Sequence, residues 1–282
     1  MVRCILDLDI FWNWQSAAIV CVPLLAAAIL LGYESAIDRA ILMRDMGVPI
    51  GVLGSLIGAQ QMIYGIDTAL FDADRIYLAT GVMFLTMLYG GVFSALGFFL
   101  SGSGEPDAGK IRTRRRLLFG KVFVLTTVWG IFLFATQKKA GAFVFIQPIS
   151  LTIFFVVAAI ALLTGKQGRY MSNLSQGCLI GSMTSVMVGI LILFSGQTVK
   201  GLLIAGAGLI YGLLGYITIY LTTYSTDESP QIAATRTNWH WIEITGFYMF
   251  MFLAPDTLLD NFQEAAVQEQ IKQLELKGEV QN

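Results

Sequence analysis

The feature that most constrains this chain is a series of apolar segments, each close to the length of a helix that crosses a bilayer. Crossing the hydrocarbon core takes about 20 residues in a helix. Eight segments approach this length: residues 11–32, 47–65, 77–100, 117–136, 142–163, 177–195, 200–222 and 240–255. The sequence therefore predicts an all-α fold, a polytopic transmembrane helix bundle with about eight spans.

The composition excludes most other classes of protein. Hydrophobic residues make up 56% of the 282 residues and charged residues only 13%, whereas about 25% charged residues is usual in soluble domains. A soluble domain of this size could not hide so much apolar surface from water. A soluble enzyme and a disordered chain are therefore excluded, and the net charge of −1 also argues against a nucleic-acid partner.

Residues that carry out chemistry are scarce. Cys4, Cys21 and Cys178 lack the spacing of a metal site, and His240 is the one histidine of the chain, in an aromatic setting typical of a membrane interface. No nucleophile–base pair, metal cluster or phosphate-binding loop is recognisable. We therefore expect no catalytic residue, no metal and no cofactor, and a chain that is not an enzyme.

Lysine and arginine placement predicts the orientation in the membrane. A basic cluster at residues 112–116 lies directly before the fourth apolar segment, and loops rich in Lys and Arg stay on the cytoplasmic side. This places both termini outside. Beyond residue 255 the chain turns polar, and residues 256–282 are predicted to form a surface helix or tail.

The apolar segments contain an internal repeat. Two dipeptides of the first half recur in the same order in the second half: Gly54-Ser55 as Gly181-Ser182, and Tyr89-Gly90 as Tyr211-Gly212. Each copy would hold four spans, an even number, so the two copies run in the same direction and form a parallel four-plus-four repeat. The predicted units are residues 1–137 and the degenerate copy 138–255.

Small residues fall on one face of several segments. Glycines at spacings of three and four let two helices approach closely in a membrane. The glycines expected to serve this packing are Gly47, Gly51, Gly54, Gly58, Gly90, Gly97, Gly208 and Gly212. Polar side chains among them are costly in lipid unless they face protein or water, and they are the candidates for channel lining or polar helix contacts: Ser55, Gln61, Thr86 and Ser182.

Residues 47–100 resemble the paired pore helices of the MotA/TolQ/ExbB proton-channel family. The first helix carries Pro49 and the pattern Gly51-x-x-Gly54-Ser55-x-x-Gly58, and the second carries Leu85-Thr86 before Tyr89-Gly90. The resemblance implies that Ser55 and Thr86 line a channel beside an aspartate supplied by a single-span partner protein. It also implies the bacterial inner membrane. The apolar spans of the first copy contain no acid at their middle, which fits such a partner.

Three functions are considered. The first is a subunit of a proton-channel or energy-transducing complex that uses the partner's intramembrane acid. The alternative is a non-catalytic scaffold subunit of a larger membrane complex, which would hold partners or pigments through its glycine-lined grooves and its 34 aromatic residues. The third is a small-solute transporter, although the broken helices and midplane charges of transporters are not evident. The expected partners are a single-span protein with an intramembrane Asp, the lipid bilayer or a larger membrane complex, and no nucleic acid.

Overall fold

The computed structural model describes residues 14–31, 36–66, 73–101, 114–137, 145–165 and 169–224. These residues form helices, and no strand occurs among them. The helices are α1 (Trp14–Leu30), α2 (Ala36–Ile66), α3 (Ala73–Ser101), α4 (Arg114–Gln137), α5 (Pro148–Thr164), α6 (Tyr170–Phe194) and α7 (Thr198–Thr223). The all-α prediction is confirmed. The eighth predicted span, 240–255, and the tail 256–282 lie outside the described residues.

Three predicted helix starts differ from the structure. The helix predicted from residue 142 begins at Pro148, and two others begin earlier than predicted, among residues that the hydropathy pattern leaves between apolar segments. The segment predicted at 47–65 is the second part of α2, which begins at Ala36, and the segment predicted at 177–195 belongs to α6, which begins at Tyr170. A hydropathy window finds only the apolar part of a helix. It misses turns whose polar residues are buried through tertiary contacts, as Asp38 and Asp45 are in α2.

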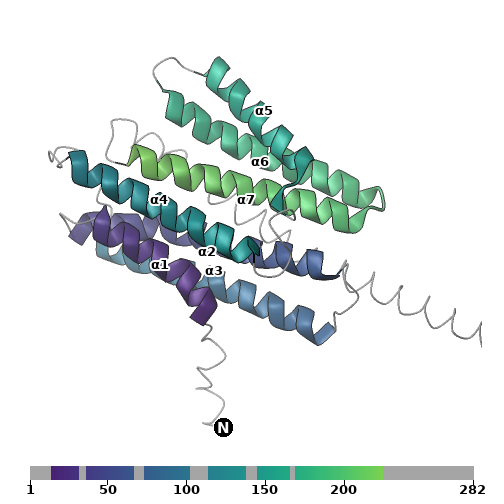
Figure 1. The fold of residues 1–282 in the computed structure, drawn as a ribbon, viewed down its shortest axis with the longest axis horizontal. Coiled ribbons are helices and arrows are strands. Elements are labelled where there is room, and N and C mark those ends of the chain that lie inside the picture. Colours follow the sequence, from purple (N-terminus) through teal and green to yellow (C-terminus); the bar gives the residue numbers. More distant parts are fainter. Residues whose placement is uncertain are drawn as a thin grey trace, which may run out of the picture.

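The helices form two groups of three that meet through α2 and α7. In the first group α1 contacts α2 and α3, and in the second group α5 contacts α6 and α7. Figure 1 shows α7 between the α5–α6 pair and the helices of the first group. The fourth helix, α4, contacts α1, α2 and α7, so it bridges the two groups.

The core lies along α2 and α7. Large side chains on both helices are almost fully buried, including Leu42, Met46 and Leu56 on α2, and Ile210 and Tyr216 on α7. Large apolar residues on α3, α4, α5 and α6 point outward instead, with Phe99, Leu163 and Phe194 at least 80% exposed. An apolar core inside an apolar surface is the pattern of a protein whose solvent is lipid.

Four of the described helices are long and apolar enough to cross a membrane. They are Ala36–Ile63, Met83–Ser101, Tyr170–Phe194 and Val199–Thr223, and three shorter apolar helices accompany them. The all-helical fold with these four helices indicates a membrane protein with transmembrane helices.

Candidate functional site

Glycines bring α2 and α3 into direct backbone contact. A Cβ atom on Gly47 would lie 2.6 Å from the carbonyl oxygen of Gly90, and one on Gly97 would lie 2.3 Å from the backbone nitrogen of Arg44. Carbon atoms cannot approach backbone this closely, so any larger residue would push the helices apart. The contact extends along the hairpin through Gly51, Gly54 and Gly58, whose added Cβ atoms would lie 3.0, 2.6 and 3.0 Å from α3.

Ser55 and Thr86 lie inside this helix contact. Ser55 is 0% exposed, and its hydroxyl lies 2.6 Å from the carbonyl oxygen of Met83 on α3 and 3.0 Å from that of Gly51. Thr86 is 3% exposed, and a Cβ on Gly54 would come within 2.6 Å of its methyl group. The two residues expected to line a channel therefore belong to the same α2–α3 contact, in which the Ser55 hydroxyl faces α3 and the Thr86 methyl group faces α2.

The two glutamines of α2 differ in their surroundings. Gln61, which sequence reasoning selected, is only partly buried. Its neighbour Gln60 is 0% exposed and donates a hydrogen bond of 3.0 Å to the carbonyl oxygen of Leu203 on α7. Gln60 therefore joins the two groups of helices.

The α6–α7 pair is also held by small residues. A Cβ on Gly189 would lie 2.6 Å from the carbonyl oxygen of Gly201, and one on Gly208 would lie 2.3 Å from the Cβ of Ser185. Gly212 is buried on the same helix. Gly208, aligned with Thr86 in the predicted repeat, thus faces a serine of α6, whereas Thr86 faces a glycine of α2.

The buried hydroxyl groups of α6 differ in their hydrogen bonding. Ser182, aligned with Ser55 in the predicted repeat, is fully buried, and its hydroxyl has no hydrogen-bond partner among the described residues. Ser185 lies one turn further on, and its hydroxyl donates to the carbonyl oxygen of Gly181 at 3.0 Å. The hydroxyl of Ser150 on α5 donates to the carbonyl oxygen of Ile204 on α7 at 2.7 Å.

A buried carboxylate that sequence reasoning missed lies where α2 meets α7. Asp45 is 2% exposed, and it accepts bonds from the Arg44 side chain at 2.8 Å and from the Tyr220 hydroxyl at 2.9 Å. The Tyr220 ring lies between those of Tyr216 and Tyr224, with centroids 6.2 and 6.1 Å away and ring planes tilted by 31° and 49°. A charge at low exposure is stable only when it is paired and hydrogen-bonded, as this one is.

One signal in the sequence pointed to this carboxylate. Asp38 and Asp45 are seven residues apart, which is two helical turns, and Leu42 between them is apolar. Because the apolar segment begins only at residue 47, hydropathy alone does not show that the two acids lie on one helix face. The partner Tyr220 is 175 residues away along the chain, and nothing in the sequence connects the two.

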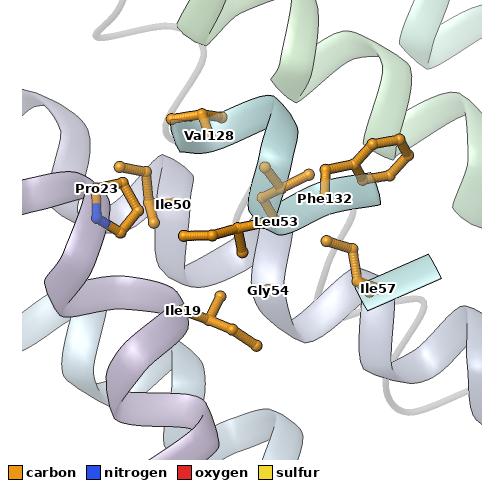
Figure 2. A pocket seen from close by; sticks show the side chains of 9 residues that line it. Ile19, Pro23, Ile50, Leu53, Gly54, Ile57, Val128 and Phe132 are labelled. Atoms are coloured by element: carbon orange, nitrogen blue, oxygen red, sulfur yellow. The ribbon is translucent and has the colours of Figure 1, made fainter. Parts of the chain in front are cut away.

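An apolar hollow lies between α1, α2 and α4, as Figure 2 shows. Ile19 and Pro23 line it from α1, Leu53 and Ile57 from α2, and Phe132 from α4. Its volume of about 10 Å³ is at the lower limit for one water molecule, and it offers no polar side chain to hold one. The hollow thus lacks both the size and the chemistry of a hydrated ion path.

No family model, curated protein or solved structure matches the chain. Within the described helices, no group of three His, Cys, Asp or Glu side chains could hold a metal ion.

Proposed function

We propose that the chain is a non-catalytic structural subunit of a larger membrane complex. The observation that carries this proposal is the burial of Ser55 and Thr86 inside the α2–α3 contact. Their side chains hold two helices together, which is the ordinary use of hydroxyls and small residues in membranes. The outward apolar faces of α3, α4, α5 and α6 are then free to contact lipid and neighbouring subunits.

The exposed fraction of the Ser55 side chain distinguishes this proposal from a channel that the same residues would line. A pore-lining group has to reach the lumen, whether the pore lies within one chain or between several copies. Ser55 is 0% exposed on the chain itself, so no arrangement of further copies around this conformation brings its hydroxyl to a lumen. A channel through these residues would first need α2 and α3 to separate.

A proton-channel or energy-transducing subunit remains a second candidate, supported by one further observation. The helix that resembles the family's first pore helix continues back to Ala36, and this extension carries the buried Asp45. We propose for this candidate a single-span partner whose intramembrane Asp docks against α2 and α3, with Asp45 and Tyr220 as additional polar groups of the chain.

The finer topology is also a proposal. We propose the bacterial inner membrane, eight spans including 240–255, both termini outside, and a parallel four-plus-four repeat. The equivalent contacts of α1–α2–α3 and α5–α6–α7 support the repeat, since in each group the first helix packs on the second and third.

The deciding experiment is isolation of the full chain in mild detergent, followed by identification of co-purifying proteins and proton-flux measurement after reconstitution. A structural subunit predicts partners in fixed stoichiometry and proton flux that Thr86→Ala leaves unchanged. A single-span partner with an intramembrane Asp, together with flux that Thr86→Ala abolishes, would establish the channel instead.

A further inference from the structure

The two groups of three helices have the same internal contacts but meet through different helices. In each group the first helix packs on the second and third, as α1 packs on α2 and α3, and α5 packs on α6 and α7. Between the groups, the second helix of one, α2, contacts the third helix of the other, α7. A contact between two different surfaces of equivalent units is head-to-tail. It leaves one surface of each kind uncovered, on the third helix of the first group, α3, and on the second helix of the second group, α6.

Burial of the four helices follows this division. Within an apolar stretch of 18 residues, 78% of α7 is buried but only 28% of its counterpart α3, and 83% of α2 is buried but only 33% of its counterpart α6. α3 packs on α1 and α2, and α6 packs on α5 and α7. Figure 1 shows α3 and α6 on opposite sides of the α2–α7 pair. The two uncovered surfaces therefore belong to opposite sides of the chain.

The α7 residues that meet α2 have exposed counterparts on α3. Leu203 and Tyr220 on α7 both form hydrogen bonds to residues of α2. The Tyr-Gly dipeptides that align the two helices give Leu203 the counterpart Gly81, and nothing among the described residues lies within 4 Å of a Cβ atom added there. The counterpart of Tyr220 is Phe98, which is 57% exposed, and Phe84, one turn after Gly81, is 37% exposed. The surface that α7 turns toward α2 is thus uncovered on α3.

The α2 residues on the other side of this contact have counterparts on α6. The Gly-Ser dipeptides that align the two helices give Gln60 the counterpart Met187, which is 64% exposed. The counterpart of Asp45 is Ser172, in the first turn of α6, and it is buried. Gln176 lies three turns before Met187 on the same helix face, and it is exposed. Beyond its first turn, the surface that α2 turns toward α7 is thus uncovered on α6.

A second copy in the same membrane orientation presents its helices in the direction that this contact requires. α2 and α7 run antiparallel, since Gln60 near the end of α2 bonds to Leu203 near the start of α7. α3 runs antiparallel to α2, and α6 runs antiparallel to α7, as the glycine contacts of each pair show. The α6 helix of one copy and the α3 helix of another are therefore antiparallel, as α2 and α7 are.

We propose that α6 of one copy of the chain binds α3 of a second copy, in the register in which α2 binds α7 within the chain. Two residues favour protein over lipid as the cover. The Gln176 amide lies on the outer face of an apolar helix, where a polar group is favoured if it meets another helix. Gly81 weakens the helix that contains it but lets a second helix approach closely.

The contact is head-to-tail, so successive copies form a closed ring or an open row. A second copy is then one of the neighbouring subunits of the structural role proposed above, and its position rests on the repeat proposed there.

The test is disulfide cross-linking between chains in membranes. The three native cysteines are first replaced by alanine. Two chains with different tags, each carrying one new cysteine, are then produced together. One matched pair combines Phe84→Cys with Met187→Cys, and the second combines Ala95→Cys with Gln176→Cys. Ala95 is exposed on α3 and Gln176 on α6, and both pairs keep the register of the α2–α7 contact to within one helical turn.

The swapped pairs are the controls. They combine Phe84→Cys with Gln176→Cys, and Ala95→Cys with Met187→Cys. Eleven residues separate the two positions on each helix, which is about 16 Å along the axis, whereas a disulfide requires Cβ atoms about 4 Å apart. Because the controls use the same four chains as the matched pairs, differences in insertion or expression cannot produce the expected result.

We expect each matched pair to give at least about tenfold more cross-linked heterodimer than the swapped pairs, because disulfide formation depends steeply on Cβ separation. Equal yields would overturn the proposal. Cross-linking of a single-cysteine chain with itself, at a higher yield than in the matched pair, would show a contact between identical surfaces and would also overturn it. The unchanged chain gives an independent measurement: membrane nanodiscs should hold more than one copy, and single copies throughout would contradict the proposal.

Residues 240–255 of the same chain are the other candidate to cover α6. If Met187→Cys forms a disulfide with a cysteine placed in this segment of its own chain and none with Phe84→Cys of a second chain, the proposed contact between copies is wrong. Failure of the cross-links is distinct from failure of the structural role. Partners that co-purify in fixed stoichiometry without matched cross-links would refute only the contact between copies. Matched cross-links together with proton flux that Thr86→Ala abolishes would refute only the structural role.

Discussion

The α2–α3 and α6–α7 pairs both contain glycines in backbone contact, but α2 and α6 have different neighbours. α2 contacts α1, α3, α4 and α7, whereas α6 contacts α5 and α7. Within an apolar stretch of 18 residues, 83% of α2 is buried but only 33% of α6. The buried face of α2 carries large residues such as Met46 and Leu56. The eight buried residues of α6 are all Ser, Gly or Cys.

This difference shows how glycine contacts act in two settings. In α2 the glycines lie on the face that contacts α3, and the other faces of the helix pack on α1, α4 and α7. A shift of α2 away from α3 therefore disturbs three further helices. In α6 the glycines belong to a buried face made entirely of small residues, and the opposite side is exposed at residues such as Met187 and Leu191. A shift of α6 away from α7, by contrast, disturbs only its packing on α5. We therefore expect equivalent substitutions to cost more in the α2–α3 pair.

The largest effect is expected from Gly90→Ala. The added Cβ would lie 2.4 Å from the carbonyl oxygen of Gly47 and 2.8 Å from the Cα of Gly51, so we expect the free energy of unfolding to fall by about 3 kcal/mol. Unfolding in mixed detergent micelles, followed by tryptophan fluorescence, measures this. The adjacent Gly91→Ala is the control, because nothing lies within 4 Å of its Cβ. Equal effects of the two substitutions would contradict the close contact.

The next largest effect is expected where the two groups of helices meet. Tyr220→Phe removes the hydroxyl that donates to Asp45, and a hydrogen bond to a charged group contributes about 1.5–3 kcal/mol. A double-mutant cycle with Asp45→Asn measures the coupling between the two side chains. Additive losses, with no coupling energy, would show that this contact does not stabilise the α2–α7 interface.

A smaller loss is expected from Gly189→Ala on α6. Its Cβ would lie 2.6 Å from the carbonyl oxygen of Gly201, as close to backbone as at Gly47. Because α6 packs on fewer helices than α2, we expect only about 1 kcal/mol of lost stability, the low end of the range for overpacking. The same unfolding assay compares it with Gly90→Ala, and a loss at Gly189 that exceeds the loss at Gly90 would reverse the comparison.

The smallest effects are expected at the two aligned serines. Ser55→Ala removes the bond to Met83, and such bonds average about 0.6 kcal/mol in membrane proteins. Ser182→Ala removes a buried hydroxyl without a partner among the described residues, so it should leave stability unchanged or raise it. The experiment compares the free energies of unfolding of the two variants. A larger loss of stability for Ser182→Ala than for Ser55→Ala would contradict the hydrogen bonding described for the two hydroxyls.

The sequence predicted the helices better than their contacts. Apolar runs such as 77–100 and 200–222 correspond to α3 and α7 within four residues at each end, because the length and composition of a span are set by local chemistry. The start of α2 was missed, since the burial of Asp45 depends on Tyr220 far along the chain. Glycine spacing indicated close packing, but it could not tell that Ser55 bonds to Met83 on α3.

Accessibility of Ser55 and Thr86 to water tests the central claim most directly. Single Ser55→Cys, Thr86→Cys and Gln197→Cys variants would be made after Cys4→Ala, Cys21→Ala and Cys178→Ala, and treated in membranes with a charged thiol reagent. Gln197 is exposed in the turn between α6 and α7 and serves as the positive control. We predict modification of the Gln197→Cys variant and no modification of the other two. Modification of Ser55→Cys and Thr86→Cys at the rate of the control would contradict a closed α2–α3 contact and establish a water-filled path along it.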